Sequence, residues 1–378
     1  MTMTDDQVLS QEHRVFQQTM RRFFDKAVPE SYVRDFYEGE AGFDPAMWRR
    51  LDAEFGLPGL AVPEEFGGSG AGLIELVLVM EEMGRCLLPS PFLGSAGLAT
   101  SVLLRLGDTE VNTCLVPRLV SSGDFAALAV TVSSGDWSED AVSVRAEGGG
   151  DDTFRLSGTV RFVLDGDLAP LLLVAARTTS GISLFEVEPD ARGLDRQRAR
   201  SLDPTRRLAT VVMHDVDGRL VGHEGTAWPA IRRGLDDAAL LLAAEQVGAA
   251  ERCMDLSVEY ARTRHQFGRP IGSFQAIKHK CADMLLRVES ARSAVYAAAF
   301  ALDQANPQAS RAVDVAAAYS GDAFSWVAKE MIQVHGGIGF TWEHPAHWYF
   351  RRATSSAALF GSATARRRRI AAALGMPC

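Results

Sequence analysis

The chain has 378 residues, of which 47% are hydrophobic and 23% charged, so it can bury a sizeable core and has the composition of an ordinary globular protein. Its 39 basic and 48 acidic residues give a net charge of −9, which argues against the global basic field that nucleic-acid binding uses. No uninterrupted run of about 18 apolar residues occurs, so we expect no membrane span.

The cysteines lie far apart, without the paired spacing that metal sites use. They are Cys86, Cys114, Cys253, Cys281 and Cys378. An odd, scattered set fits a reducing compartment better than a disulfide framework. The N-terminus, Met-Thr-Met-Thr-Asp-Asp, is polar and acidic and does not resemble a signal peptide. We therefore expect a cytoplasmic protein without a metal site.

Apolar residues at helical spacing dominate the first third of the chain. The predicted helices cover residues 7–25, 45–55, 73–86 and 93–106. The expected core residues of the first helix are Val15, Met20, Phe23 and Phe24. A segment rich in Gly and Pro, residues 56–70, separates the second helix from the third and is too long for a tight turn. Near Leu115 the helical character ends.

The middle third of the chain has the pattern of a β domain. Short apolar segments separated by Gly, Asp and Pro predict strands at residues 125–131, 171–176, 182–187 and 210–213. Residues 155–166 look like a strand, a turn and a second strand. Residues 151–153 follow three glycines and are the expected tip of a mobile hairpin. Together these features predict a β-sandwich or barrel.

From Trp228 onward the helical pattern returns. Apolar residues on one stripe of a long helix are Leu240, Ala244, Val247, Met254, Val258 and Ala261. Ser273 is the predicted N-cap of the next helix, residues 274–304. Further elements are helices at residues 309–332, 345–358 and 364–374 and a Gly-rich turn at residues 333–340. The predicted domains are helical (1–118), β (119–226) and helical again (227–378).

The long helix ends in residues 260–275, Tyr-Ala-Arg-Thr-Arg-His-Gln-Phe-Gly-Arg-Pro-Ile-Gly-Ser-Phe-Gln, where Gly268 and Pro270 stop it. Arg264 offers a planar, permanently charged fork for a phosphate oxygen. Gln266 offers amide hydrogen bonds, and Phe267 offers a flat apolar face. These residues could hold a dinucleotide by its pyrophosphate and adenine. Taken alone, they are equally compatible with a helix end that carries solvated Arg side chains.

Several motifs, in this order, resemble the acyl-CoA dehydrogenase family of flavoproteins. Residues 56–70 resemble its Gly-Leu-x-Gly-x-x-x-Pro-Glu-Glu-x-Gly-Gly element, and residues 264–268 resemble its Arg-x-x-Phe-Gly element. Residues 275–277 (Gln-Ala-Ile) and 333–339 (Gln-Val-His-Gly-Gly-Ile-Gly) resemble two further elements. The resemblance covers nearly the whole chain. The combination at these spacings is specific, although any one motif alone is weak.

The resemblance implies an α+β fold with an N-terminal helical domain, a middle β domain and a C-terminal four-helix-bundle domain. It implies a tetramer, a dimer of dimers, that binds FAD at each dimer interface and oxidises an acyl-CoA to an enoyl-CoA, with electron-transfer flavoprotein as the electron acceptor. The positions that match the residues holding the ADP half of FAD, usually the neighbouring subunit's, are Arg264, Gln266, Phe267, Gln333, Val334, Gly336 and Gly337. The two glycines let backbone N–H groups approach phosphate closely.

In the family reaction a carboxylate removes a proton from Cα while a hydride leaves Cβ for flavin N5, which calls for a desolvated carboxylate beside the thioester. Neither family position for this base carries a carboxylate here. The position near the C-terminus is Phe360, and the alternative on the long helix is Ala238. The neighbouring Asp236 and Asp237 are weak candidates. Glu245, about two turns further along, fits better as a polar residue packed between helices.

The middle domain also departs from the family. The loop Thr-Glu-Pro-x-x-Gly-Ser-Asp, which lies along the flavin, corresponds to residues 131–138 (Thr-Val-Ser-Ser-Gly-Asp-Trp-Ser). The strand Lys-x-Trp-Ile-Thr-Asn-Gly corresponds to residues 160–166 (Val-Arg-Phe-Val-Leu-Asp-Gly). Leu164 replaces the hydroxyl that contacts the reactive edge of the flavin. The elements that hold the flavin ring in the same subunit are eroded, whereas those that reach a neighbour are retained.

This asymmetry predicts the subunit of a heteromeric dehydrogenase that lacks the base and donates ADP-binding residues to flavin sites on a paralogous chain. Actinobacterial steroid side-chain dehydrogenases include α2β2 assemblies with half the flavin sites, and residues 339–345 (Gly-Phe-Thr-Trp-Glu-His-Pro) look like that branch. Two alternatives stay open. One is a self-sufficient homotetramer with Asp236 or Asp237 as base, and the other is a flavin-free acyl-CoA-binding or scaffold protein.

Three further features have ordinary structural interpretations. His335, in the Gly-rich turn, is expected to be structural rather than a base or a metal ligand. The four arginines at residues 366–369 point around the whole helix, so we expect salt bridges and solvation instead of a nucleic-acid site. For Trp342 and Trp348 we expect core packing or a subunit contact rather than an acyl pocket.

Overall fold

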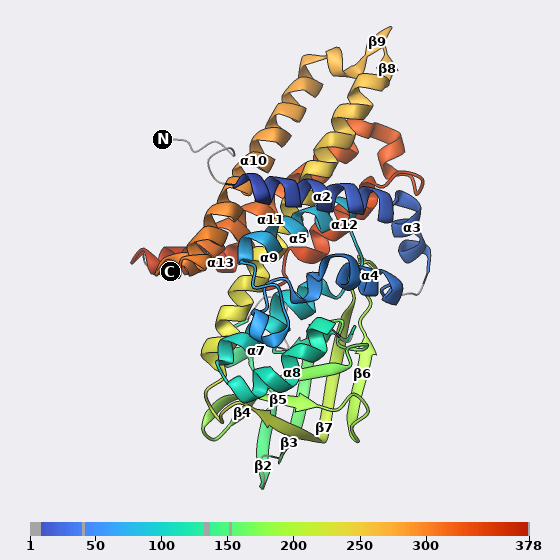
Figure 1. The fold of residues 1–378 in the computed structure, drawn as a ribbon. Helices are drawn as coiled ribbons and strands as arrows, with labels where there is room; N and C mark the ends of the chain where they lie inside the picture. The colour runs from blue at the N-terminus through green and yellow to red at the C-terminus, as the bar shows by residue number, and fades with distance from the viewer. Residues whose placement is uncertain (1–8, 40–41, 122, 132–136, 151–152, 377–378) are drawn as a thin grey trace.

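The structure is a computed structural model that describes residues 9–39, 42–121, 123–131, 137–150 and 153–376. Figure 1 shows helices from both ends of the chain packed together, with the β-strands gathered at one end of the molecule. The hairpin of β8 and β9 projects at the opposite end. The predicted order of a helical part, a β part and a second helical part is confirmed.

The N-terminal part is helical, as predicted. Its helices are α2 (Gln11–Ala27), α3 (Glu30–Glu38), α4 (Pro45–Phe55), α5 (Leu73–Cys86), α6 (Phe92–Gly94), α7 (Thr100–Leu106) and α8 (Thr109–Ser121). Local signals set α4: the Asp44 side chain accepts a hydrogen bond from the Ala46 N–H, and Gly56 ends the helix with a φ of 61°. The helices α3 and α8 were not predicted, because α3 spans nine residues and α8 contains Pro117.

Two details of this part differ from the prediction. The expected helix at residues 93–106 is divided by a π-helical turn, η3 (Ser95–Ala99), between α6 and α7. In α2, Met20 and Phe24 are buried and Phe23 is half-buried, but Val15 is exposed. Met20 lies five positions after Val15, which places the two side chains about 140° apart around the helix. The segment at residues 56–70 contains two 3-10 turns, η1 (Leu57–Gly59) and η2 (Glu64–Phe66).

The middle part forms a closed, barrel-like sheet. Its strands are β1 (Ala126–Ala129), β2 (Arg145–Gly150), β3 (Thr153–Leu164), β4 (Leu171–Thr178), β5 (Gly181–Val187), β6 (Leu194–Arg198) and β7 (Leu208–Val221). Pairing runs from β4 through β2, β3, β7 and β5 back to β4, while β1 joins β4 and β6 joins β7. Residues 155–164 belong to the single strand β3, which has two register shifts, so the turn predicted between two strands there is wrong. Residues 151 and 152 of the expected hairpin tip lie outside the described residues.

The C-terminal part is a bundle of long helices. Its elements are α9 (Trp228–Thr263), β8 (His265–Gln266), β9 (Arg269–Pro270), η5 (Ile271–Ser273), α10 (Gln275–Asp303), α11 (Ala309–His335), η6 (Gly336–Phe340), α12 (Ala346–Ser356) and α13 (Ala363–Ala373). Ser273 is not the N-cap that the sequence predicts. The cap residue is Phe274, and the Ser273 hydroxyl is buried without a partner among the described residues. On the predicted stripe of α9, Met254 and Val258 are only half-buried and line an open groove against α10.

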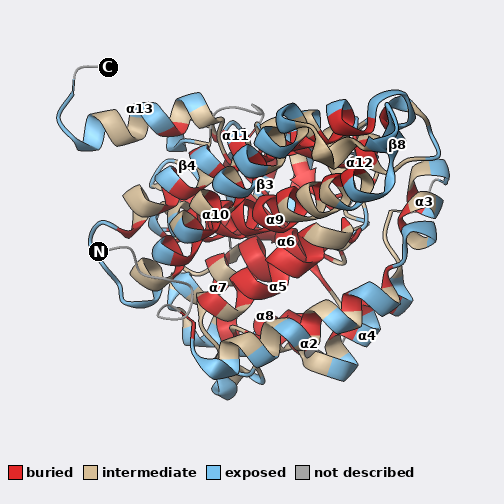
Figure 2. Ribbon diagram, turned by 90° about the horizontal axis from the view of Figure 1, so that it is seen from above, coloured by how far each residue is buried: buried red, intermediate tan, exposed pale blue. Residues whose placement is uncertain are grey.

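Helices α5 and α9 cross in direct backbone contact at the centre of the molecule, where Figure 2 shows both as buried. A Cβ atom on Gly248 would lie 1.8 Å from the carbonyl oxygen of Glu81, and one on Gly84 would lie 2.0 Å from that of Glu245. The two helices can therefore approach this closely only because each presents a glycine to the other.

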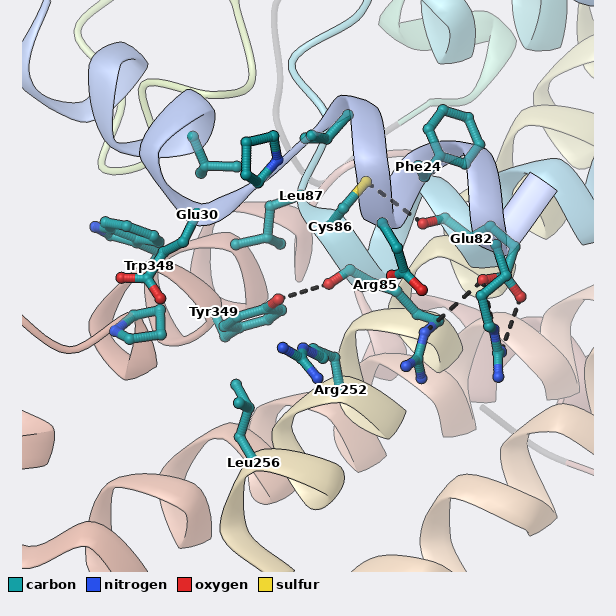
Figure 3. A pocket seen from close by; sticks show the side chains of 16 residues that line it. Phe24, Glu30, Glu82, Arg85, Cys86, Leu87, Arg252, Leu256, Trp348 and Tyr349 are labelled. Carbon is teal, nitrogen blue, oxygen red and sulfur yellow. Dashed lines mark hydrogen bonds and ion pairs between the residues drawn. The ribbon is translucent and has the colours of Figure 1, made fainter. Parts of the chain in front are cut away.

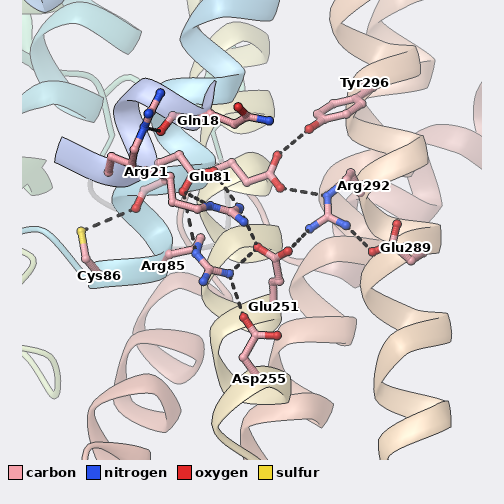
Figure 4. Close-up of polar contacts among 12 residues, drawn as sticks. Gln18, Arg21, Glu81, Arg85, Cys86, Glu251, Asp255, Glu289, Arg292 and Tyr296 are labelled. Carbon is pink, nitrogen blue, oxygen red and sulfur yellow. Dashed lines mark hydrogen bonds and ion pairs between the residues drawn. The ribbon is translucent and has the colours of Figure 1, made fainter. Parts of the chain in front are cut away.

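Ion pairs join four helices beside this crossing (Figure 4). Arg292 of α10 pairs with Glu81 of α5 at 2.8 Å and with Glu251 of α9 at 3.2 Å. Glu251 also pairs with Arg85 of α5 at 2.5 Å and with Arg21 of α2 at 3.1 Å. The N-terminal helices are thus fixed to the C-terminal bundle by half-buried and buried charges, where removing one partner costs most.

Within the described ranges, no helix is long and apolar enough to cross a membrane, and no group of three or more His, Cys, Asp or Glu side chains could hold a metal ion. The four described cysteines have free thiols.

Candidate cofactor and active site

The hairpin after α9 carries three of the predicted cofactor-binding residues. Helix α9 ends at Thr263, and the backbone of Arg264 is extended. In the antiparallel hairpin that follows, Gln266 on β8 is opposite Arg269 on β9. Both central residues have positive φ, 53° at Phe267 and 77° at Gly268, as in a type I′ turn. This geometry turns the Phe267 ring outward, where it is 91% exposed. Such exposure of a large aromatic ring indicates a surface that something else covers.

Arg264 and Gln266 are exposed beside this ring. The Gln266 amide donates to the His265 carbonyl at 2.8 Å. No carboxylate in the described part of the chain pairs with the Arg264 guanidinium. The neighbouring Arg269 lies 4.2 Å above the Phe274 ring. Arg264 is thus available for an external anion, whereas Arg269 stacks on the protein.

The Gly-rich turn after α11 carries the remaining predicted residues. Gly336 has a φ of 62°, and a Cβ atom added to Gly336 or Gly337 would meet no described atom within 4 Å, so the backbone of both faces open space. Gln333 is exposed, but the Val334 side chain is buried, which leaves Val334 only its backbone for a ligand. An exposed amide and open glycine backbone are the donors that a pyrophosphate needs.

Aromatic contacts bring the hairpin and the Gly-rich turn to the same end of the bundle. The rings of Tyr260, on α9, and His335, on α11, lie 4.5 Å apart, and the His335 ring lies 4.2 Å from that of His344. His335 Nδ1 also lies 2.7 Å from the Met331 carbonyl oxygen, and burial lowers the pKa of this imidazole. His335 is a structural residue, as the sequence suggests. A cation, amides and open backbone at one end of the bundle fit the ADP part of a dinucleotide.

The two positions expected for a catalytic base are both buried and apolar. The Phe360 ring packs against Trp137 at 5.1 Å, and its backbone carbonyl accepts a hydrogen bond from Arg366. Ala238 is fully buried on α9. Residues 132–136, the rest of the loop that corresponds to the family's flavin-contacting element, lie outside the described residues. Neither Phe360 nor Ala238 can accept a proton.

The two carboxylates beside Ala238 are engaged by arginines. Asp236 pairs with Arg232 at 2.6 Å and with Arg369 at 3.4 Å. Asp237 pairs with Arg105 at 2.6 Å and accepts a hydrogen bond from Ser101 at 2.6 Å. Burial raises the pKa of Asp237, and Arg105 opposes this shift. Asp237 borders a cavity against α7 that shares no lining residue with the one beside Leu164.

A buried ion cluster fills the junction between the three parts of the chain. Glu245 on α9 accepts hydrogen bonds from Arg206 and from Arg352 on α12, the latter at 2.9 Å. Arg352 also pairs with Asp203, whose carboxylate accepts from the Tyr37 hydroxyl at 3.1 Å. Burial opposes ionisation of Glu245, but the two guanidinium groups outweigh it and lower its pKa. Glu245 is a structural anion, which agrees with the interpretation from the sequence.

Little space remains next to this cluster. The cavity that Leu164, Glu245 and Arg352 border has a volume of about 20 Å³, about the space of one water molecule. Leu164 packs so tightly on Gly94 that a Cβ atom there would lie 2.9 Å from the Leu164 Cβ. The same wall includes Asp165, where burial raises the pKa of the carboxyl to about 7. Among the described residues, the side chains at this junction pack on each other and leave no space for a ring system.

A larger cavity of about 270 Å³ lies between α2, α5, α9 and α12 (Figure 3). Its chemically reactive groups are not free. Two hydrogen bonds of 2.9 Å from Arg21 engage Glu82, and burial raises the pKa of the Cys86 thiol to about 12. The Tyr349 hydroxyl donates to the Arg85 carbonyl at 2.5 Å. Neither Glu82 nor Cys86 is therefore available as a base or a thiolate nucleophile.

Of the remaining features that the sequence singled out, Arg366, Arg369 and Trp348 have structural roles, whereas Trp342 is not part of the core and its subunit contact stays a prediction. Arg366 is buried and pairs with Asp314 at 2.8 Å, and Arg369 pairs with the same carboxylate at 3.1 Å. Trp348 is buried and stacks on Tyr37 at 5.3 Å, whereas Trp342 is 68% exposed. The ion cluster around Arg352 was missed from the sequence. Its only local signal was Arg352 within Phe350-Arg351-Arg352-Ala353, a segment that resembles the Tyr-Arg-Asp-Ala of the acyl-CoA dehydrogenase family but has an arginine in place of the aspartate.

Known proteins share both the sequence pattern and the fold. The family model described as acyl-CoA dehydrogenase, C-terminal domain, matches residues 225–375, and the one described as acyl-CoA dehydrogenase, N-terminal domain, matches residues 10–123. The chain is 35% identical over 365 residues to acyl-CoA dehydrogenase IpdE2 of Mycolicibacterium smegmatis, covering 96% of this chain and 99% of that protein.

Two solved assemblies are similar in structure. A chain of the ChsE4-ChsE5 complex from Mycobacterium tuberculosis matches with a TM-score of 0.88 and 30% identity, over 98% of this chain and 99% of that one. A chain of a variant of the Tcur3481-Tcur3483 steroid ACAD matches with a TM-score of 0.85 and 29% identity, over 96% and 98% of the two chains.

Proposed function

Because the chain belongs to the acyl-CoA dehydrogenase family, whose members are FAD-dependent oxidoreductases acting on acyl-CoA, we propose a specific role for it within a heteromeric enzyme. It is the subunit that lacks the catalytic base and supplies the ADP-binding half of the FAD site. The base and the flavin-ring site belong to a paralogous chain. The two chains form an α2β2 tetramer with one FAD for every two chains.

One contrast carries this proposal. The hairpin and the Gly-rich turn present an exposed cation, exposed amides and open backbone to the outside. The cavity beside Leu164, in contrast, has a volume of only about 20 Å³, and residues of the ion cluster form part of its wall. A self-contained enzyme needs both halves, whereas a donor subunit needs only the first.

The residues assigned to the ADP half have separable roles. The Arg264 guanidinium neutralises the pyrophosphate, and the open backbone at Gly336 and Gly337 allows its close approach. Gln266 and Gln333 supply amide hydrogen bonds, and Phe267 covers an apolar face of the nucleotide. FAD held by these residues would supply the acceptor for the hydride that leaves Cβ of the acyl group. In this chain no residue at the family positions takes the Cα proton, because these are Phe360 and Ala238.

The homotetramer alternative requires Asp236 or Asp237 as the base. Asp237 has a raised pKa, which favours it, but it is paired with Arg105 and faces a different cavity from Leu164. Asp236 is held by Arg232 and also accepts a hydrogen bond from Ser310 at 2.8 Å. A flavin-free scaffold does not explain why Arg264 and Phe267 are exposed. The donor-subunit role accounts for both observations.

The flavin content of purified protein tests the proposal. The chain is expressed alone and together with a paralogous acyl-CoA dehydrogenase chain that carries the glutamate, and visible spectra are recorded with and without acyl-CoA. The expected result is no flavin alone, one FAD per two chains in the complex, and bleaching on addition of substrate. Flavin that bleaches with acyl-CoA in the chain alone would overturn the proposal in favour of the homotetramer. Absence of flavin from both preparations would favour the scaffold.

The wider setting follows from the same proposal. The solved ChsE4-ChsE5 complex pairs two different chains, and the Tcur3481-Tcur3483 assembly is called a steroid ACAD, so we assign a steroid side-chain acyl-CoA as the substrate class. Electron-transfer flavoprotein is the proposed electron acceptor. The free thiols of the described cysteines agree with a cytoplasmic location.

A further inference from the structure

Three aromatic rings join the two parts of the ADP-binding site. The Tyr260 ring, on the last turn of α9, lies 4.5 Å from the His335 ring at the end of α11, and the His344 ring lies 4.2 Å from that of His335. We call these three residues the ring cluster. The Tyr260 carbonyl accepts a hydrogen bond from the Arg264 N–H at 2.8 Å, and His335 directly precedes Gly336. The ring cluster therefore connects the position of Arg264 to that of the Gly-rich turn.

Backbone contacts fix both imidazoles of the ring cluster. His335 is 4% exposed, and its Nδ1 lies 2.7 Å from the Met331 carbonyl oxygen, so this nitrogen carries a hydrogen that it donates. His344 Nδ1 accepts a hydrogen bond from the Ala346 N–H at 3.2 Å and therefore carries none. The Gly-rich turn closes over His335, because a Cβ atom on Gly339 would lie 3.2 Å from the His335 Cβ. A further proton can bind only to His335 Nε2, or to His344 Nδ1 with loss of its hydrogen bond.

A proton on either imidazole would have no carboxylate to balance it. In the described part of the chain, the titratable and charged groups next to these two rings are Tyr260 on α9, Arg34 on α3, His347 and Arg351 on α12, and Glu343 in the segment before α12. Glu343 is exposed, and neither imidazole forms a salt bridge with a described residue. Burial lowers the pKa of His335, and burial, together with His335 and His347, lowers the pKa of His344 to about 4. The folded structure therefore favours the neutral rings.

We propose that His335 is a positioning residue for the cofactor, whose neutral ring holds the Gly-rich turn beside the end of α9, and that protonation of the ring cluster displaces this turn and releases the ADP part of FAD. This inference rests on the proposed function and adds its regulation by pH. The buried imidazole of His335 acts through Gly336 and Gly337 and does not touch the nucleotide. Because the neutral ring cluster is the form that binds, the affinity for FAD is complete above the pKa of the cluster and decreases as the pH falls through it.

The dissociation constant of FAD, measured by flavin fluorescence in the complex with a paralogous chain, tests this role. Between about pH 7.5 and about pH 5 it should rise about threefold or more in the wild type, and by at most about tenfold per pH unit for each proton. His335→Phe keeps a ring beside Tyr260 but cannot titrate, so it should still bind FAD and limit the rise to less than about twofold. His214→Phe, an exposed position on β7, is the matched control and should show the rise of the wild type.

A second variant covers the case in which His335→Phe does not fold. His335→Asn retains an N–H donor for the Met331 carbonyl and cannot titrate, and circular dichroism verifies the folding of each variant at each pH. A wild-type complex that retains no FAD at about pH 7.5 would overturn the proposed function together with this inference. If the complex binds FAD but the wild type shows no pH dependence, or if a folded His335 variant keeps the full rise, the inference alone is overturned.

Discussion

Replacing Glu245 with alanine removes the one carboxylate that two buried guanidinium groups share. In the folded chain, the side chains of Arg206 and Arg352 are 6% and 2% exposed, so neither can turn to water without a rearrangement. Arg352 keeps Asp203 and the Thr205 hydroxyl, at 2.6 Å, but Arg206 loses the only carboxylate with which it forms a salt bridge in the described part of the chain.

Leaving a buried charge without its partner costs about 3–5 kcal/mol, and the total stability of a domain is about 5–15 kcal/mol. We therefore expect Glu245→Ala to lower the free energy of unfolding by about 3–5 kcal/mol, measured by urea denaturation monitored by tryptophan fluorescence. Glu259→Ala, an exposed position on the same helix, should stay within about 0.5 kcal/mol of the wild type.

The double variant Glu245→Ala/Arg206→Met separates loss of the ion pair from loss of packing. It removes the orphaned cation together with its carboxylate, so it should be more stable than Glu245→Ala alone. If Glu245→Ala costs less than about 1 kcal/mol, or if the double variant is the less stable of the two, the cluster is not a dry, closed network. The explanation given for the filled cavity beside Leu164 would then be wrong.

Three further predictions concern single positions. Arg264→Ala in the complex with a flavin-binding partner should weaken FAD binding about 10- to 150-fold, because one charge-assisted hydrogen bond of about 1.5–3 kcal/mol is lost. The control Arg22→Ala, on α2, should leave the FAD dissociation constant unchanged. Gly248→Ala should destabilise the chain by about 3 kcal/mol or more in the same urea assay, because its Cβ would overlap the Glu81 carbonyl. The control Gly321→Ala should be neutral or stabilising, since its Cβ meets only the Gln246 side chain at 3.7 Å. Equal effects of the two substitutions would contradict the close crossing of α5 and α9. Because burial raises the pKa of Asp165 to about 7, the folded chain holds this proton more tightly than the unfolded chain, so the stability of the fold should decrease as the pH rises from about 4 to about 7. In thermal melts, Asp165→Asn should weaken this pH dependence, whereas the control Asp190→Asn should not. An unchanged pH dependence in Asp165→Asn would refute the assignment.

The sequence predicted those elements whose signals are local. The bounds of α4 follow from Asp44, Pro45 and Gly56, which act within one helical turn of each end. Residues 73–86 were predicted for α5 because the segment is continuous, apolar and follows a Gly-rich loop. In contrast, α8 was missed because Pro117 interrupts the local pattern, although the helix is maintained by packing. The end of the long helix before Gly268 and Pro270 was predicted from these two residues, but the β-hairpin that carries Phe267 was not.

The ion cluster shows why the contacts in the candidate active site could not be predicted from the sequence as fully as the helices were. Arg352 reaches Asp203 and Glu245, which lie 149 and 107 residues earlier in the chain, and each of the three belongs to a different element. No local pattern links positions so far apart. From the sequence, Glu245 could be described only as a polar residue between helices. The structure adds the two arginines that keep it ionised and unavailable as a base.

The position of these residues along α9 supports the division of labour between two chains. Glu245 lies in the middle of the helix and Arg264 just after its end, about 28 Å apart at 1.5 Å per residue. At Glu245, buried ion pairs occupy the space beside the helix. Beyond the end of the helix, the Arg264 guanidinium is exposed and the Phe267 ring is 91% exposed. An exposed non-glycine residue with positive φ is unfavourable for an isolated chain. This cost is offset if a second subunit and its nucleotide cover Phe267, in agreement with the proposal that the flavin ring of this nucleotide lies in the other chain.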